Sequence, residues 1–153
     1  MKFCEKYIDK SYIEINDCRK IISLKDKRAS SSKYVCQNEN KKRVMVYKVD
    51  DGIIKSKDIG KCDYALYNHD DDIVFFIELK GSDYEQAIEQ IDSTIRNLIT
   101  SKSIEINVIN ARVVLTKVRT PEINTTKEIK LKILLNKYKG ILTKQTRLMN
   151  DYI

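Results

Sequence analysis

The stretch CDYALYNHDDDIVFFIELK, residues 62–80, contains two runs of β-forming residues separated by a polar turn at residues 68–72. If the two runs pair as an antiparallel hairpin centred on this turn, Asp63 lies directly opposite Glu78. The same register makes the other cross-strand pairs apolar or aromatic: Tyr64 with Ile77, Ala65 with Phe76, Leu66 with Phe75 and Tyr67 with Val74. Because side chains alternate along a strand, Lys80 is expected on the face that bears Asp63 and Glu78.

Two opposed carboxylates are unfavourable in a purely structural hairpin, because like charges repel across the ladder and an inward carboxylate loses hydration. A divalent cation bound between Asp63 and Glu78 removes this objection. Hard oxygen ligands at a partly open site suit Mg²⁺ or Mn²⁺, which keep bound waters and accept phosphate oxygens. The ammonium group of Lys80 can then orient an attacking water and offset the charge that develops on a phosphodiester. The alternative is structural, with Asp63 as a strand-edge charge and Glu78 with Lys80 as a solvated strand end.

Asp63, a gap of 14 residues and the triplet Glu78-Leu79-Lys80 together resemble the signature of the PD-(D/E)XK nuclease superfamily. This superfamily includes restriction endonucleases and Holliday-junction resolvases. The resemblance implies that Asp63 and Glu78 bind catalytic Mg²⁺ and that the backbone carbonyl of Leu79 can join them. It implies that Lys80 assists hydrolysis. Cys62 stands at the position where the superfamily name has proline.

An amphipathic helix is predicted after the hairpin, over about residues 83–101. Its apolar face comprises Ala87, Ile88, Ile91, Ile95, Leu98 and Ile99. Ser82 is the predicted N-cap, and Glu85 completes a capping box. Gln86 and Gln90 share a helix face near the strand end that bears the lysine. In several branches of the resembled superfamily a glutamine on this helix contacts the lysine or the metal-bound water, a role that the resemblance implies for Gln90 first and Gln86 second.

Helical spacing also occurs in residues 1–30. Phe3, Cys4, Tyr7 and Ile8 mark one helix face, and a second apolar group either continues this helix or forms another: Tyr12, Ile13, Ile15, Cys18, Ile21 and Ile22. The resemblance implies a helix before the first strand, which in some members supplies an extra glutamate near the metal. Glu5 and Glu14 are the candidates, and the alternative for each is a solvent-facing carboxylate.

Strands are predicted at residues 34–36 and 43–49, with a loop at 29–33 and a turn at 50–52. Residues 53–60 are predicted to form a loop or a short bent strand that leads into the central hairpin. Residues 106–117 are apolar and β-branched, which indicates a strand buried on both faces.

A second helix is predicted over residues 126–139, capped by Thr125 and stopped by Gly140. Its predicted apolar face comprises Ile129, Ile133, Leu134 and Tyr138. Residues 141–149 are expected to form a final edge strand, in which Lys144 and Arg147 discourage edge pairing.

The order of these elements predicts a single α/β domain over residues 1–153, with three α-β-α layers and a central mixed sheet. The same order is found in the restriction endonuclease-like core, and the resemblance covers about residues 43–117.

Hydrophobic residues make up 42% of the chain and charged residues 33%, as in soluble globular proteins. No apolar run approaches the length of a membrane span, and the N-terminus lacks a signal-peptide layout, so the cytoplasm is the expected compartment. The four cysteines form no CxxC pattern, which favours reduced thiols over a zinc site.

The net charge of +7 is concentrated in the last third of the chain. Residues 1–100 contain 18 basic and 18 acidic residues, whereas residues 101–153 contain 11 and 4. This asymmetry predicts a polyanionic partner, although a lysine-rich composition that only maintains solubility is the alternative. The residues expected to contact phosphates are Lys127, Lys130, Lys132, Lys137, Lys139, Lys144 and Arg147.

These observations predict a Mg²⁺-dependent nuclease with DNA as the expected substrate. A homodimer or a larger complex is expected if both strands of a duplex are cut, since a domain of this size covers few base pairs. The alternative is a catalytically silent binding module with the nuclease fold, such as an immunity protein, an antitoxin or a scaffold subunit. The presence of Asp63, Glu78 and Lys80 together favours the enzyme, because degenerate relatives usually lose one of these groups.

Overall fold

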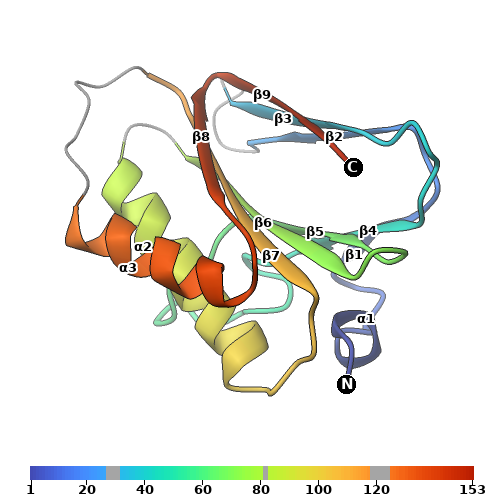
Figure 1. Ribbon diagram of the computed structural model, residues 1–153, viewed down its shortest axis with the longest axis horizontal. Helices are drawn as coiled ribbons and strands as arrows, with labels where there is room; N and C mark the ends of the chain where they lie inside the picture. The colour runs from blue at the N-terminus through green and yellow to red at the C-terminus, as the bar shows by residue number, and fades with distance from the viewer. Residues whose placement is uncertain (27–31, 81–82, 118–124) are drawn as a thin grey trace.

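The computed structural model describes residues 1–26, 32–80, 83–117 and 125–153, except the side chain of Lys80. A six-stranded mixed sheet lies at its centre (Figure 1). In spatial order its strands are β1 (Ile13–Asp17), β4 (Val44–Lys48), β5 (Tyr64–Asn68), β6 (Ile73–Lys80), β7 (Val108–Leu115) and β8 (Leu142–Thr146). The pairs β1–β4, β4–β5 and β5–β6 are antiparallel, and the pairs β6–β7 and β7–β8 are parallel. The predicted α/β class with a mixed sheet is confirmed.

The central hairpin has the predicted register. Tyr64 pairs with Ile77 and Tyr67 pairs with Val74, and the pairs between them follow in order. Every residue of β5 is buried, because the sheet is covered on both faces. Strands β5 and β6 carry matching apolar side chains on both faces, and these side chains therefore fix the register of the hairpin.

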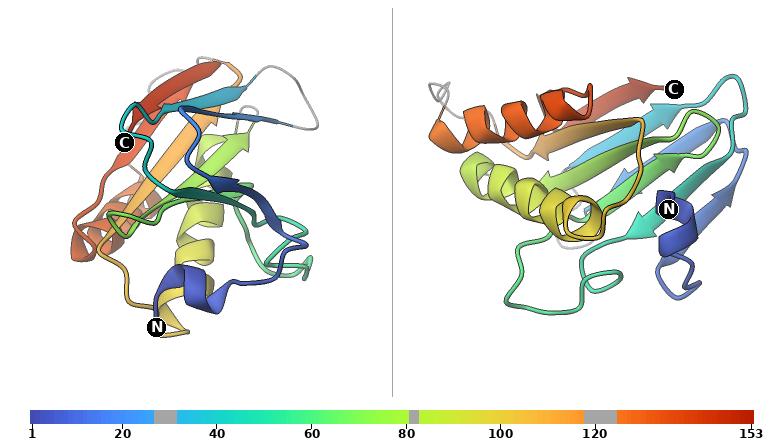
Figure 2. Two further views of the ribbon diagram at one scale, coloured as in Figure 1. Left: turned by 90° about the vertical axis from the view of Figure 1, so that its right-hand side faces the viewer. Right: turned by 60° about the horizontal axis from the view of Figure 1, so that its bottom comes forward.

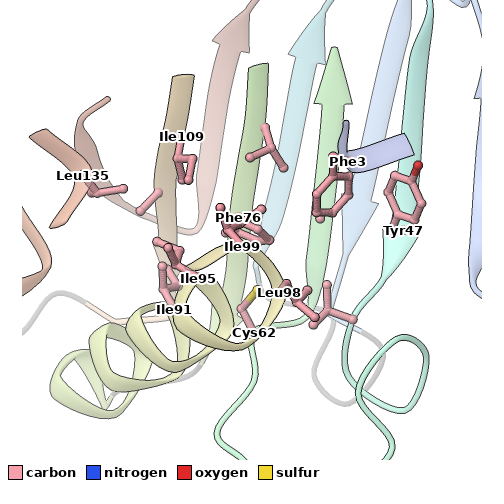
Figure 3. Close-up of a cluster of buried hydrophobic side chains, with 14 of the residues drawn as sticks. Phe3, Tyr47, Cys62, Phe76, Ile91, Ile95, Leu98, Ile99, Ile109 and Leu135 are labelled. Atoms are coloured by element: carbon pink, nitrogen blue, oxygen red, sulfur yellow. The ribbon is translucent and has the colours of Figure 1, made fainter. Parts of the chain in front are cut away.

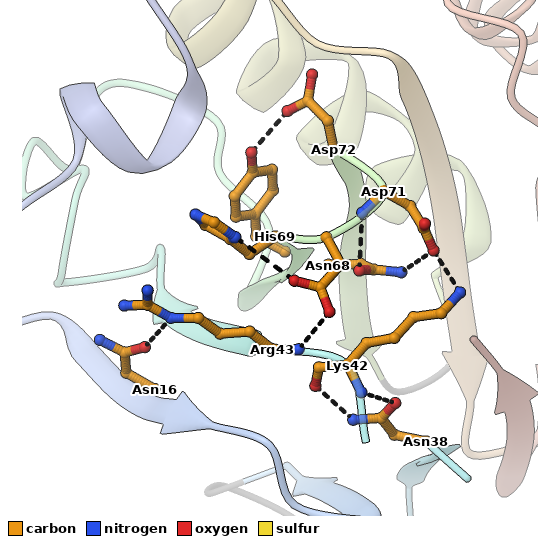
Figure 4. A network of polar contacts seen from close by, with 10 residues as sticks. Asn16, Asn38, Lys42, Arg43, Asn68, His69, Asp71 and Asp72 are labelled. Atoms are coloured by element: carbon orange, nitrogen blue, oxygen red, sulfur yellow. Dashed lines mark hydrogen bonds and ion pairs between the residues drawn. The ribbon is translucent and has the colours of Figure 1, made fainter. Parts of the chain in front are cut away.

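The hairpin turn is stabilised by polar contacts to the loop that precedes β4 (Figure 4). The Asp71 carboxylate forms an ion pair with Lys42 and accepts a hydrogen bond from the side-chain amide of Asn68. These two contacts lower the pKa of Asp71, with Lys42 as the larger cause. The backbone N–H of Arg43 donates to Asp70. The aspartates of the turn thus stabilise the end of the hairpin opposite to Asp63.

Helix α2 (Tyr84–Ile95) follows β6, and a π-helical turn, η1 (Arg96–Thr100), extends it. The predicted apolar face is confirmed, and Ile91, Ile95 and Ile99 are buried in one cluster with Phe76 and Ile109 of the sheet (Figure 3). The N-cap is Asp83, whose carboxylate accepts from the backbone N–H of Gln86. The predicted N-cap, Ser82, lies outside the described residues. Strand β7 pairs with β6 in parallel, as expected, because α2 connects the two strands by crossing one face of the sheet.

The second face of the sheet is covered by another sheet, so the predicted α-β-α layering is wrong in its third layer (Figures 1 and 2). This small sheet has the order β2 (Ile21–Lys25), β3 (Lys33–Gln37) and β9 (Leu148–Tyr152). Its buried side chains alternate along the strands, as Ile22 and Leu24 do in β2 and Tyr34 and Cys36 do in β3. They pack against Leu66, Phe75 and other residues of the central strands.

The helix predicted in residues 12–22 is also wrong, because β1 and β2 occupy this region. Helix α1 is confined to Phe3–Lys6, on the same side of the central sheet as α2. The predicted strands at residues 34–36 and 43–49 are confirmed as β3 and β4.

Helix α3 (Thr126–Lys137) begins as predicted at Thr125, whose hydroxyl accepts from the backbone N–H of Glu128. Its buried face differs from the prediction: Leu131, Leu134 and Leu135 are buried, whereas Ile129 and Ile133 are exposed. After the helix, Gly140 is required by close approach, because a Cβ atom there would lie 1.5 Å from the carbonyl oxygen of Ile109.

The predicted edge strand over residues 141–149 divides into β8 and β9 at Arg147, which has a φ of 67°. The N–H of Arg147 donates to Leu115 in the large sheet, and its carbonyl accepts from Lys33 in the small sheet. This residue is therefore the corner at which the chain passes between sheets. No helix in the described parts of the chain has the length and apolar character needed to cross a membrane.

Candidate active site

Asp63 lies directly before β5, at the end of the hairpin away from the turn. Its carbonyl accepts a hydrogen bond from the N–H of Val49, which extends the ladder between β4 and β5. Its side-chain Oδ2 accepts from the backbone N–H of Leu79 at 2.8 Å. Asp63 therefore contacts the residue that follows Glu78, and the predicted meeting of the Asp63 and Glu78 carboxylates stays a prediction.

Glu78 lies in β6 and is 1% exposed. Strand alternation places it on the face of Phe76, which packs against α2, whereas Ile77 and Leu79 face the small sheet. Lys80 is the last residue of β6 and pairs with Leu115. The side chain of Lys80 lies outside the described residues, so its role in the site stays a prediction.

Cys62 connects this acidic region to α2. Its N–H donates to the hydroxyl of Thr94 at 2.9 Å, and its thiol is fully buried (Figure 3). Burial raises the pKa of the Cys62 thiol well above its usual value, and the carboxylates of Glu78 and Asp63 act in the same direction. Both carboxylates therefore lie within electrostatic range of one buried thiol.

Two clefts adjoin Asp63. The first, of about 300 Å³, is lined by Asp50, Lys57, Ile59, Gly60, Lys61, Asp63, Gln86, Glu89 and Gln90. The second, of about 200 Å³, is lined by Lys25, Asp26, Lys48, Asp50, Asp51, Asp63 and Tyr64. Asp50 and Asp63 line both clefts and therefore lie where the two meet.

The first cleft brings Gln86 and Gln90 to the same cavity as Asp63, and their contact with Lys80 or a metal-bound water stays a prediction. It also contains Lys57 and Lys61, which the sequence prediction did not identify. These lysines belong to a loop without periodic structure, so no pattern in the sequence indicated their direction.

Glu5 and Glu14 line neither of these clefts. The carboxylate of Glu5 accepts from the N–H of Lys2 and caps α1. Glu14 is an exposed residue of β1. Burial is the main cause that raises the pKa of Tyr64 to about 12, and the negative charge of Glu14 is the second cause. Glu14 thus acts electrostatically on Tyr64, which lines the second cleft.

The oxygen donors of Asp63, Glu78 and the Leu79 carbonyl match the ligand preference of Mg²⁺ and Mn²⁺. No cluster of three or more His, Cys, Asp or Glu side chains suited to a metal ion occurs within the described ranges. A two-carboxylate set still fits Mg²⁺, because this ion often binds one or two carboxylates and completes its shell with water and phosphate oxygens.

The basic residues of the last third differ in how they are paired. Lys127 forms ion pairs with Glu85 and Glu89 of α2. Lys132 and Lys144 lie 3.5 and 4.0 Å from the buried carboxylate of Glu128, and Lys144 also lies 4.5 Å from the ring centroid of Tyr84. Three of the seven residues predicted to contact phosphates therefore already contact acidic side chains.

The chain matches no protein-family model, and no curated protein or solved structure is significantly similar to it. The resemblance to PD-(D/E)XK nucleases thus depends on the residues at the strand ends and on their strand context.

Proposed function

We propose that this protein is a metal-dependent nuclease that hydrolyses phosphodiester bonds in nucleic acid, with DNA as the substrate. The observation that supports the proposal best is the hydrogen bond from Leu79 N–H to the Asp63 carboxylate. It fixes Asp63 to the strand end that contains the buried Glu78, beside a cleft that is open to solvent. A purely structural hairpin end would have little reason to hold two carboxylates there.

Asp63, Glu78 and the carbonyl of Leu79 would hold Mg²⁺ or Mn²⁺ in this proposal. The bound ion would activate water and stabilise negative charge on the phosphate. Asp63 would keep its orientation through the Leu79 amide, which donates to one of its carboxylate oxygens. Gln90 would orient a water in the cleft, and Lys80 would stabilise the developing charge at the phosphate.

The cleft lysines would bind the phosphates that flank the scissile bond. Lys57 and Lys61 line the cleft on one side of Asp63, and Lys25 and Lys48 line the cleft on the other. Cations on both sides of the two aspartates suit a polyanionic chain that crosses the junction between the clefts.

A catalytically silent binding module with a nuclease-like arrangement is the second candidate. It is favoured by the burial of Glu78, which is 1% exposed and would need access to a metal ion. The two functions differ in whether metal and nucleic acid produce cleavage or only binding.

Nuclease assays with plasmid, linear, branched and single-stranded DNA in Mg²⁺ or Mn²⁺ test the proposal. We expect cleavage that EDTA abolishes and that Glu78→Gln and Lys80→Ala each lower by at least about 100-fold. The matched controls are Glu39→Gln and Lys10→Ala, which change exposed residues of the same types. Cleavage that survives in both active-site variants, or binding without cleavage on every substrate, would reject the nuclease.

A further inference from the structure

Helix α3 presents apolar side chains on two faces. Leu131, Leu134 and Leu135 are buried against the rest of the protein. Ile129 and Ile133 lie one turn apart on the outer face and are 48% and 59% exposed. Neighbouring exposed apolar side chains on one helix face form a patch of the kind that often marks an interaction surface.

The exposed isoleucines line a groove. This groove, of about 540 Å³, is larger than either cleft beside Asp63 and lies between α3 and the chain entering β8. Ile141, which is 63% exposed, and Leu142 form its other wall. Helix α3 and the edge strand β8 lie together at one side of the molecule, where a partner can approach (Figure 2). We call the surface formed by Ile129, Ile133 and Ile141 the α3 groove.

The rim of the α3 groove is basic. Lys132 lines it directly, and Lys130 and Lys137 line a second hollow on the other side of the isoleucine stripe. Neither Lys130 nor Lys137 forms an ion pair with any residue in the described ranges, and Glu128, the nearby acid of α3, is 3% exposed. An apolar stripe with Lys130 and Lys137 on one side and Lys132, which lies 3.5 Å from the buried carboxylate of Glu128, on the other fits a ligand that is apolar in the middle and acidic at its edges.

This charge pattern distinguishes three possible occupants. A second copy of the chain would bring two basic rims together, which is unfavourable. Nucleic acid would satisfy the lysines but would leave the isoleucines without apolar contacts. An amphipathic helix with acidic flanks satisfies both, because its apolar side chains at three- and four-residue spacing can lie along the stripe while its carboxylates reach the rim.

We propose that the α3 groove binds an acidic amphipathic helix of another protein. The inference is independent of the nuclease proposal, since it uses no residue of the metal site or of the clefts beside Asp63. It assigns Lys130, Lys132 and Lys137 to protein recognition in place of phosphate contacts.

A designed peptide tests this proposal. The probe is a fluorescently labelled helix with leucines on one face and glutamates on both flanks, and a matched probe has lysines in place of the glutamates. We expect the acidic peptide to bind with a Kd of about 10–100 μM in fluorescence anisotropy. Amide chemical-shift changes in NMR spectra should be confined to α3 and to residues 140–142. The lysine-flanked peptide should bind at least about tenfold more weakly.

Substitutions identify the surface. Ile133→Glu should weaken binding of the acidic peptide at least about tenfold without loss of folding, because the side chain is mostly exposed. The matched control is Ile8→Glu, which changes an isoleucine that is 69% exposed outside the groove and should leave binding unchanged. Equal binding of the two peptides, or no binding of the acidic one, would overturn the proposal.

The other occupants give different results. A concentration-dependent dimer that Ile133→Glu dissociates, measured by sedimentation, would assign the groove to a second copy and overturn the proposal. Loss of duplex oligonucleotide binding in Lys130→Ala/Lys137→Ala would assign the face to nucleic acid and overturn it as well. Nuclease activity is measured separately, so failure of the groove proposal leaves the proposed reaction untouched.

Discussion

The central sheet buries ionisable side chains on both faces, and the two sets differ in charge balance. On the face that packs against the small sheet, the Nε atom of Arg112 donates to Asp151 at 2.8 Å, and the hydroxyl of Tyr34 donates to the same carboxylate oxygen at 2.8 Å. On the helical face, Glu78 and Asp63 flank the buried thiol of Cys62. One face thus pairs a cation with an anion, whereas the other places two carboxylates near one buried thiol.

The paired face has a structural role. Arg112 also donates to the carbonyls of Ala111 and Ile141 and lies 5.1 Å from the ring centroid of Phe75, so its donors hold β7, β8 and β9 together. Such a network favours one arrangement of the two sheets. In the proposed nuclease, the two carboxylates near Cys62 would instead be neutralised by the bound metal ion.

Breaking the paired cluster should produce the largest effect. Arg112→Met removes the cation and leaves Asp151 with an uncompensated charge between the sheets, so we expect a loss of about 3 kcal/mol in the free energy of unfolding. Urea denaturation monitored by circular dichroism measures this loss.

The double variant Arg112→Met/Asp151→Leu is the control for that experiment. It removes both charges and should recover most of the lost stability, because apolar replacements of a buried ion pair are often neutral. A loss below about 1 kcal/mol in the single variant would mean that Asp151 is adequately solvated, and the contrast between the two faces would disappear.

Alkaline pH should sharpen the comparison, since each face contains a buried thiol. Burial, followed by the charge of Asp151, raises the pKa of Cys36 from its ordinary 9.0 to about 12. Above pH 9 the unfolded chain ionises this thiol while the folded chain keeps it protonated. Stability is therefore fully present below pH 9 and falls as the pH rises toward 12, by up to about 1.4 kcal/mol per unit for one such group.

Cys36→Ala should reduce this slope by about that amount, as measured by urea denaturation between pH 8 and 11. The exposed Cys18 provides the control, because Cys18→Ala should leave the slope unchanged. An identical slope in wild type and Cys36→Ala would show that the thiol ionises equally in both states.

The hairpin and its register could be predicted from the sequence, because a polar turn between two matched apolar runs leaves one pairing that buries every side chain. Helix α2 and strand β7 could also be predicted from the sequence, because each has a long run of apolar residues with a clear pattern. Residues 13–25 could not be assigned in this way. The alternating patterns here, such as Ile13 with Ile15 and Ile22 with Leu24, are too short to exclude a helix. Strand β2 is stabilised as a strand by its pairing with β3, which the local sequence does not indicate.

The candidate site was predictable only in part. The pairing of Asp63 with the segment at Glu78 followed from the register, and the reach of Gln90 into the cleft followed from helix periodicity. Lys57 and Lys61 are positioned by the loop between β4 and β5, whose path depends on tertiary contacts such as the hydrogen bond from Val49 to Asp63. The outer face of α3 was assigned to the core because apolar residues on both faces give no preference for either one.

The smallest effect, and the most direct test of the like-charge face, concerns Asp63. Asp63→Asn keeps a side-chain oxygen that can accept from Leu79 N–H and removes the charge near Glu78. In EDTA we expect this variant to be more stable than wild type by about 0.5–1 kcal/mol, because a like-charge repulsion is relieved. Millimolar Mn²⁺ should stabilise the wild type by about 1.4 kcal/mol if the ion is present at tenfold excess over its Kd, and should leave Asp63→Asn unchanged.

Asp63→Ala separates the charge from the hydrogen bond. It removes both, so the Leu79 amide loses its acceptor and the variant should be about 1 kcal/mol less stable than Asp63→Asn. Urea denaturation of the three proteins with EDTA or Mn²⁺ gives all of these differences. If Asp63→Asn is destabilised as much as Asp63→Ala and Mn²⁺ has no effect on the wild type, the carboxylate of Asp63 is a stabilising group like Asp151. Both faces of the sheet would then bury charge for structural reasons, and the binding module would replace the nuclease as the better interpretation.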